Sequence, residues 1–143
     1  MYRKILVPLD GSDTAHAGLL HAIALARAQG ATLLLLHALA APQAGEPDSG
    51  KARHRDALEI LARGKREVLA AGLHCETLLR EFTGADIPDV IEQQAVQHHC
   101  DLVVMGTHAR RGLEWLAQGS QAQALARSSR TPLLLVPPAA LSG

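Results

Sequence analysis

The chain has 143 residues, with equal numbers of basic and acidic side chains and 48% hydrophobic residues. This length predicts a single domain, residues 1–143, whose core needs no disulfide or metal to hold it. A formal net charge of zero argues against a nucleic-acid or acidic-membrane binder, because such proteins normally carry a basic excess. Alanine and leucine fill about a third of the chain and aromatic residues only 2%, which favours helices and leaves few rings for stacking on bases.

Cysteine usage and the first apolar run indicate the compartment. Cys75 and Cys100 are too few for a disulfide framework, so we expect a reducing environment. The run Ile5–Leu9 is too short for the core of a signal peptide or for a membrane span. We therefore expect a cytoplasmic protein that binds neither nucleic acid nor membrane.

Apolar runs alternate with amphipathic segments along the whole chain. In chain order we expect a strand at 5–9, a helix at 14–29, a strand at 31–38, a helix at 51–71, a shorter strand at 75–80, a helix opening at Asp86 or Pro88, a strand at 101–105, a helix at 119–129 and a strand at 131–136. Residues 40–50 are rich in Pro and Gly and predict a flexible loop.

The helical patterns also predict which side chains are buried. In the first helix, Leu19, Leu20 and Ile23 are expected on the inner side. In the second helix, the expected inner face carries Leu58, Leu61, Val68 and Leu69.

The strands are continuously apolar rather than alternating. Strands of this kind need cover on both faces, so the order β-α-β-α-β-α-β-α-β predicts an α/β fold with a doubly wound parallel sheet. In such sheets ligands bind at the carboxyl ends of the strands, where the direction of winding reverses.

Two strand ends carry residues suited to a ligand site. Pro8-Leu9-Asp10-Gly11 follows the first strand, and Met105-Gly106-Thr107-His108-Ala109-Arg110 follows the fourth. The second loop leads to Gly119-Ser120 at a helix start, where backbone N–H groups favour an anion. The competing interpretation is that these residues only shape turns and helix ends. Glycines commonly end strands, serines commonly begin helices, and an aspartate such as Asp10 is common in turns.

The same segments resemble the universal stress protein family. The resemblance rests on VPLDGS near the start, LLHA at the second strand, DLVVMGTHARRGLEWLAQGS in the fourth-strand region and TPLLLVP at the end. It implies a five-stranded Rossmann-like sheet in the order 3-2-1-4-5, a homodimer and, in one subgroup, an ATP site with the motif G-x2-G-x9-G-S/T. Gly106, Gly119 and Ser120 match that motif, whereas Ala109 replaces its second glycine.

The resemblance also implies roles for single residues. Asp10 would meet the ribose or a nucleotide-bound Mg²⁺, and the backbone of Ala38 would meet the adenine. Gly106, His108, Gly119, Ser120 and Gln121 would line the phosphates. The full expected nucleotide set is Pro8, Leu9, Asp10, Ala38, Met105, Gly106, His108, Ala109, Arg110, Gly119, Ser120 and Gln121.

Ala109 keeps a second hypothesis open. A residue other than glycine costs about 1–2 kcal/mol if its position requires a positive φ, and its methyl group hinders close approach of a phosphate. The leading hypothesis is a stress-response protein that binds ATP or a related adenine nucleotide without rapid turnover. The alternatives are a dimeric adaptor of the same fold without nucleotide, or a very slow ATPase.

The last strand predicts the oligomeric state. Leu133, Leu134, Leu135 and Val136 are all apolar, although the strand order implied by the resemblance places them at the sheet edge. Two copies that pair these edges about a two-fold axis would satisfy the exposed backbone groups. His98-His99-Cys100-Asp101 contains metal-binding residue types, but it precedes the fourth strand, at the end of the sheet opposite the expected cleft.

Overall fold

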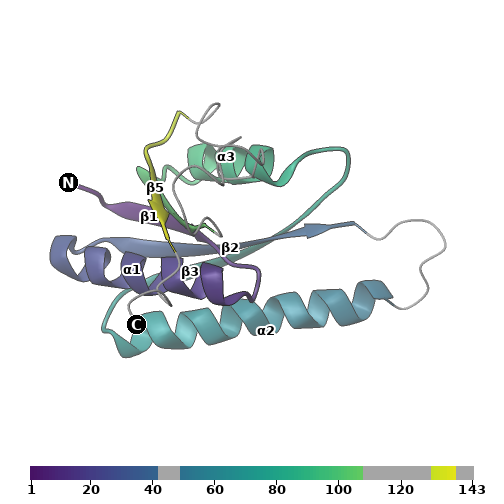
Figure 1. Ribbon diagram of the computed structural model, residues 1–143, viewed down its shortest axis with the longest axis horizontal. Coiled ribbons are helices and arrows are strands. Elements are labelled where there is room, and N and C mark those ends of the chain that lie inside the picture. The colour runs from purple at the N-terminus through teal and green to yellow at the C-terminus, as the bar shows by residue number, and fades with distance from the viewer. Residues whose placement is uncertain (42–48, 108–129, 138–143) are drawn as a thin grey trace.

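A computed structural model describes residues 1–41, 49–107 and 130–137 (Figure 1). The elements are β1 (Lys4–Pro8), α1 (Asp13–Gln29), β2 (Thr32–Ala40), α2 (Ser49–Ala70), β3 (Cys75–Phe82), α3 (Ile87–Gln97), β4 (Leu102–Gly106) and β5 (Leu133–Val136). The last helix expected from the sequence, at 119–129, lies outside the described residues.

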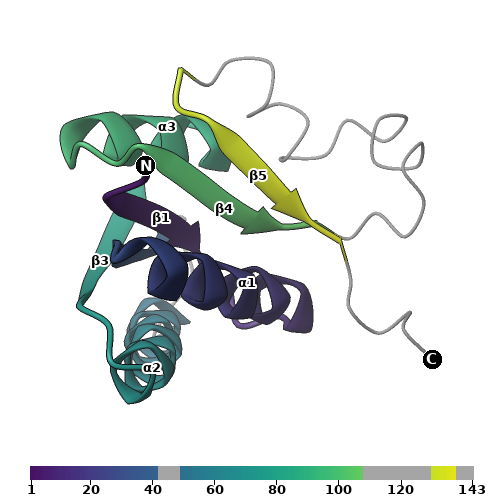
Figure 2. The same ribbon diagram turned by 90° about the vertical axis from the view of Figure 1, so that its left-hand side faces the viewer.

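The five strands form one parallel sheet in the order β3-β2-β1-β4-β5, as predicted (Figure 2). The central strand β1 pairs with β2 on one side and β4 on the other, so that Leu6 lies beside both Leu34 and Val103. From β1 to β3 the chain moves toward one sheet edge, and α3 then carries it back across to β4. The winding therefore reverses between β1 and β4.

Helices cover both faces of the sheet, which explains the unbroken apolar strands. Figure 1 shows α3 on one face and α1 with α2 on the other. The side of β1 that carries Ile5 and Val7 belongs to the core beneath α1 and α2, whereas Leu6 belongs to the core beneath α3. All three side chains are fully buried, and burial of each stabilises the fold by about 1.5–3 kcal/mol.

Local signals set the ends of α1. Ser12 is the N-cap, and its hydroxyl accepts a hydrogen bond from the Ala15 N–H at 3.1 Å. Gly30 ends the helix at φ +72°, a left-handed conformation that favours glycine. Among the described residues, no helix is long and apolar enough to cross a bilayer.

Several elements differ in length from the expectation. β2 extends to Ala40 and α2 begins at Ser49, so the connection between them is shorter than the loop expected over 40–50. β3 is an eight-residue strand rather than a short one, because its whole length pairs with β2. β5 begins at Leu133, two residues later than expected.

Three of the leucines expected on inner helix faces are in fact half-exposed. Leu20 of α1 and Leu58 and Leu69 of α2 are 50%, 49% and 51% exposed. The buried face of α2 contains Leu61 and Val68, as expected, together with Ala57 and Gly64. These residues recur at helical spacing, and the small ones allow the helix to lie close to the sheet.

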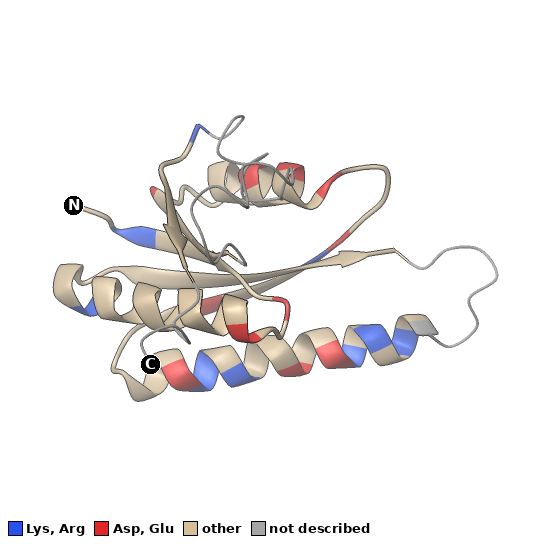
Figure 3. Cartoon of the chain, in the orientation of Figure 1, with Lys and Arg blue, Asp and Glu red and all other residues tan. Residues whose placement is uncertain are grey.

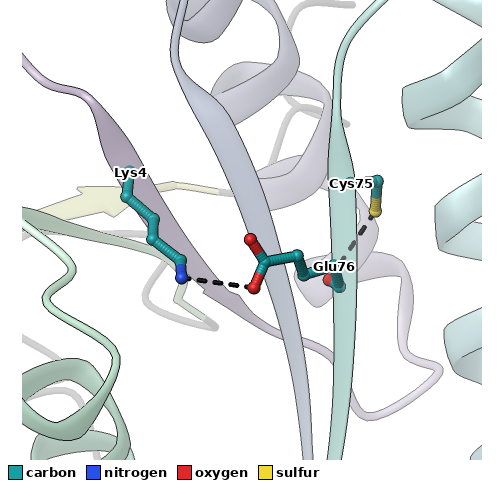
Figure 4. Close-up of polar contacts among 3 residues, drawn as sticks. All are labelled: Lys4, Cys75 and Glu76. Atoms are coloured by element: carbon teal, nitrogen blue, oxygen red, sulfur yellow. Dashed lines mark hydrogen bonds and ion pairs between the residues drawn. The ribbon is translucent and has the colours of Figure 1, made fainter.

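Polar contacts hold the amino ends of the strands. The Lys4 ammonium of β1 reaches across β2 to the Glu76 carboxylate of β3, at 3.2 Å, while the Cys75 thiol donates to the backbone carbonyl of Glu76 (Figure 4). The Asp101 carboxylate accepts hydrogen bonds from the Arg3 and Lys4 backbone N–H groups. Asp101 thus ties the start of β4 to the start of β1.

Candidate functional site

The carboxyl ends of β1, β2 and β4 lie side by side at one end of the sheet, which we call the carboxyl end. Because the strands are parallel and adjacent, this end of the sheet contains Pro8-Leu9-Asp10, Ala38 and Met105-Gly106. These six residues are half of the set expected to bind nucleotide. The other half, namely His108, Ala109, Arg110, Gly119, Ser120 and Gln121, lies outside the described residues.

Asp10 organises the turn that leads from β1 into α1. Its Oδ1 accepts a hydrogen bond from the Ser12 N–H at 2.9 Å, and Gly11 between them has φ +86°. This is the turn-forming role that the sequence left open for Asp10. The side chain is exposed, and Oδ2 makes no hydrogen bond or ion pair with the residues that the structure describes. The second oxygen is therefore available to a ligand.

His37, near the carboxyl end of β2, is a polar residue for which the sequence predicted no role. Its Nδ1 lies 2.7 Å from the Leu9 carbonyl oxygen, and because that oxygen can only accept, Nδ1 carries the proton. The Leu9 N–H in turn donates to the Leu36 carbonyl at 2.8 Å. Both bonds hold the end of β1 against β2, next to Ala38. The sequence feature that could have indicated a role for His37 is its position directly before Ala38 in the segment LLHA.

Gly106 has a packing role that its motif position does not show. A Cβ atom on Gly106 would lie 2.0 Å from the Thr14 carbonyl oxygen, and one on Gly18 would lie 2.7 Å from the Gly106 backbone nitrogen. The first turns of α1 therefore cross the end of β4 backbone to backbone. Gly106 does not have a positive φ, so the reason for glycine here is space.

The described residues contain no group of three or more His, Cys, Asp or Glu side chains placed to hold a metal ion. Within the segment His98–Asp101, Cys100 packs in the core beneath α3 and Asp101 binds backbone N–H groups. Burial raises the pKa of the Cys75 and Cys100 thiols to about 11, with smaller contributions from neighbouring charges. Both thiols are therefore protonated and weakly nucleophilic at neutral pH.

Comparison with known proteins identifies the family. The family model of the universal stress proteins matches residues 1–137. The chain belongs to the universal stress protein family. A universal stress protein of Thermus aquaticus is 36% identical over 95% of this chain and 99% of its own length. One of Methanocaldococcus jannaschii is 29% identical over 95% of this chain and 82% of its own.

Solved universal stress proteins share the fold. A crystal structure from Burkholderia pseudomallei has a TM-score of 0.81 and 29% identity, covering 96% of this chain and 97% of that one. Another, in complex with cAMP, has a TM-score of 0.75 and 24% identity over 96% and 99% of the two chains. Two further solved structures contain a nucleotide: a universal stress protein family protein of Arabidopsis thaliana with AMP, and the universal stress protein of Archaeoglobus fulgidus with dAMP. At 19% and 23% identity these two show the fold alone.

Proposed function

We propose that this protein binds an adenine nucleotide, ATP or a relative of it, at the carboxyl ends of β1 and β4. The observation that carries the proposal is the strand order, which makes β1 and β4 neighbours where the winding reverses. Crystallised members of the family hold cAMP, AMP and dAMP, which supports an adenine ligand. In this proposal the protein holds its ligand in the cytoplasm without rapid turnover.

The described half of the site fits the nucleoside. Ala38 ends in a short methyl group, and its neighbour His37 is held by the Leu9 carbonyl, so the backbone beside it is fixed for contact with a flat base. The exposed Oδ2 of Asp10 suits a ribose hydroxyl, which donates to a carboxylate. The phosphates are assigned to the segment 106–121, in which the sequence predicts a loop and a helix start and in which Ala109 replaces a glycine of the family motif.

Mg²⁺ would enter only with the nucleotide. The free oxygen of Asp10 is a ligand type that Mg²⁺ accepts, and one carboxylate with phosphate oxygens and water is a common set for this ion. Asp10 would supply that carboxylate as the alternative to its contact with the ribose.

The first experiment identifies nucleotide that copurifies with the protein. Protein purified without added nucleotide is denatured, and the released small molecules are analysed by mass spectrometry. We expect an adenine nucleotide at a substantial fraction of one per chain. Absence of copurified nucleotide, together with no heat of binding for ATP, AMP or cAMP in calorimetry, would favour the dimeric adaptor.

Variants of the proposed site test the role of each part. Asp10→Asn keeps an oxygen for the Ser12 N–H while removing the charge, so it should weaken nucleotide binding without loosening the turn. Asp13→Asn, in the first turn of α1, is the matched control. Gly119→Val should weaken binding by crowding the phosphate amides, and Ala109→Gly should bind at least as tightly as the wild type. Full affinity in a folded Gly119→Val variant would contradict the assignment of the phosphates.

We also propose a homodimer that pairs through β5. This strand is at the edge of the sheet (Figure 2), and its three leucines are only partly buried. An apolar edge with unpaired backbone groups favours pairing with a second copy. Light scattering should give a mass near twice 15.2 kDa, and Leu134→Lys should halve it. A wild-type mass of one chain would refute the dimer.

A further inference from the structure

A cavity of about 620 Å³ lies between α1 and α2, on the face of the sheet away from α3. Both helices lie side by side against that face in Figures 1 and 2. The volume is within the range of small-molecule sites. Leu9 is the one residue that this cavity shares with the expected nucleotide set, whose other described members do not line it.

The floor of the cavity is apolar and belongs to the core. Leu9 lines it from the residue that follows β1, Ala15 and Leu19 line it from α1, and Ile60 lines it from α2. Small residues leave the space open between the helices, because Ala15 and Ala70 have only a methyl group to fill it. Gly64 instead lets α2 lie close to the floor, since a Cβ atom there would lie 2.8 Å from a methyl carbon of Leu9.

The rim is polar and contains two arginines that have no partner among the described residues. The His16 ring joins the Glu67 carboxylate at 2.8 Å and so links α1 to α2. Arg63 and Arg66 also line the cavity, yet neither makes an ion pair or hydrogen bond with any residue that the structure describes. Asp13 is the remaining acidic residue of the rim, and no ion pair joins it to either arginine. Figure 3 shows that basic positions, coloured blue, recur along α2 among acidic ones, coloured red.

We propose that this cavity binds an organic anion, a small molecule with an apolar body and one acidic group. The apolar body would lie on the floor of Leu9, Leu19 and Ile60. The acidic group would accept hydrogen bonds from the Arg63 and Arg66 guanidinium groups, which are geometrically suited to carboxylate, sulfonate or phosphate oxygens. Among the described residues, this site shares only Leu9 with the expected nucleotide set, and its binding does not depend on the proposed nucleotide.

Two fluorescent probes of the same shape test the proposal. 8-Anilino-1-naphthalenesulfonate has an apolar body with one sulfonate, and N-phenyl-1-naphthylamine has the same body without charge. Titrations are made by calorimetry in saturating ATP, so that the nucleotide site does not contribute. We expect one sulfonate probe per chain, bound about fivefold more tightly than the neutral probe. Amide signals of Gly11 and Gly64 should shift on binding.

Matched variants on α2 localise the binding. Arg63→Gln and Arg66→Gln should each remove most of the preference for the sulfonate probe and leave the affinity for the neutral probe almost unchanged. Lys65→Gln, at a position outside the cavity, should keep that preference. Ala70→Phe should weaken both probes by filling the space, and Ala62→Phe, exposed and outside the cavity, should weaken neither.

Three results would each overturn the proposal. The first is no binding of the sulfonate probe to the wild type in saturating ATP. The second is equal affinity for the two probes. The third is equal effects of Arg63→Gln and Lys65→Gln, or of Ala70→Phe and Ala62→Phe, in variants whose circular dichroism shows an intact fold.

Discussion

Gly106→Ala is expected to be one of the most destabilising single-methyl additions in this protein. The new Cβ would lie 2.0 Å from the Thr14 carbonyl oxygen and 2.7 Å from its carbonyl carbon. Both are backbone atoms of α1, so no side-chain rotation relieves the contact. Restoring a separation of about 3 Å requires α1 and β4 to move apart by roughly 1 Å.

That displacement disturbs the whole buried face of α1. Ala15, Leu19, Ala22 and Ala26 are buried against the sheet and would lose contact together. We therefore expect a loss of about 3 kcal/mol in the free energy of unfolding, the upper part of the usual range for overpacked cores. For a chain of this length, the loss corresponds to a fall of about 10 °C in Tm.

Gly72→Ala is the matched control because it separates the two reasons for glycine. Gly72 has φ +81° and open space around its Cβ position, so the expected cost is the conformational one, about 1 kcal/mol. Urea unfolding followed by circular dichroism at 222 nm measures both. A cost for Gly106→Ala equal to or below that of Gly72→Ala would refute the reasoning from space.

A companion variant tests whether the two glycines of this crossing act together. Gly18→Ala places its Cβ 2.7 Å from the Gly106 nitrogen, so the shift that accommodates one methyl makes room for the other. The double variant should therefore cost less than the sum of the single variants. Strict additivity would show that Gly18 and Gly106 are accommodated by separate movements.

Three further variants or conditions have expected outcomes. Ser12→Ala removes the acceptor for the Ala15 N–H and should lower the free energy of unfolding in urea by about 1 kcal/mol. Ser12→Asp, which keeps an acceptor, should retain most of the wild-type stability. Equal stabilities of the wild type and Ser12→Ala would contradict the cap. Asp101→Ala leaves the Arg3 and Lys4 N–H groups without their acceptor and should cost about 1–2 kcal/mol, with Asp89→Ala on the exposed side of α3 as the control. Because burial raises the pKa of the Cys75 and Cys100 thiols from 9.0 to about 11, the unfolded chain loses thiol protons first as pH rises. The stability contributed by these neutral thiols is present below pH 9 and lost toward pH 11, and a Cys75→Ala/Cys100→Ala variant should lose less stability over that range than the wild type.

The sequence by itself determined the architecture of this protein. Runs such as Ile5–Leu9 and Leu33–Leu36 are apolar at every position and are short, as is typical of strands covered on both faces. Ser12 and Gly30 determined the ends of α1 through local hydrogen bonding and backbone conformation. The doubly wound sheet and its parallel strands follow from these local facts, and the resemblance to a known family added the strand order.

Only the tertiary structure decided the roles of single residues. The helical pattern could not tell that Leu20, Leu58 and Leu69 are half-exposed, because a helix in isolation has no sheet to define its inner face. The sequence presented Gly106 as part of a ligand motif, whereas its packing depends on Thr14 of α1, which is far away in the sequence. The cavity with Arg63 and Arg66 at its rim likewise depends on how α1 and α2 pack beside each other on the sheet, which neither helix determines alone. Local chemistry specifies elements, whereas distances between elements arise from packing the whole chain at once.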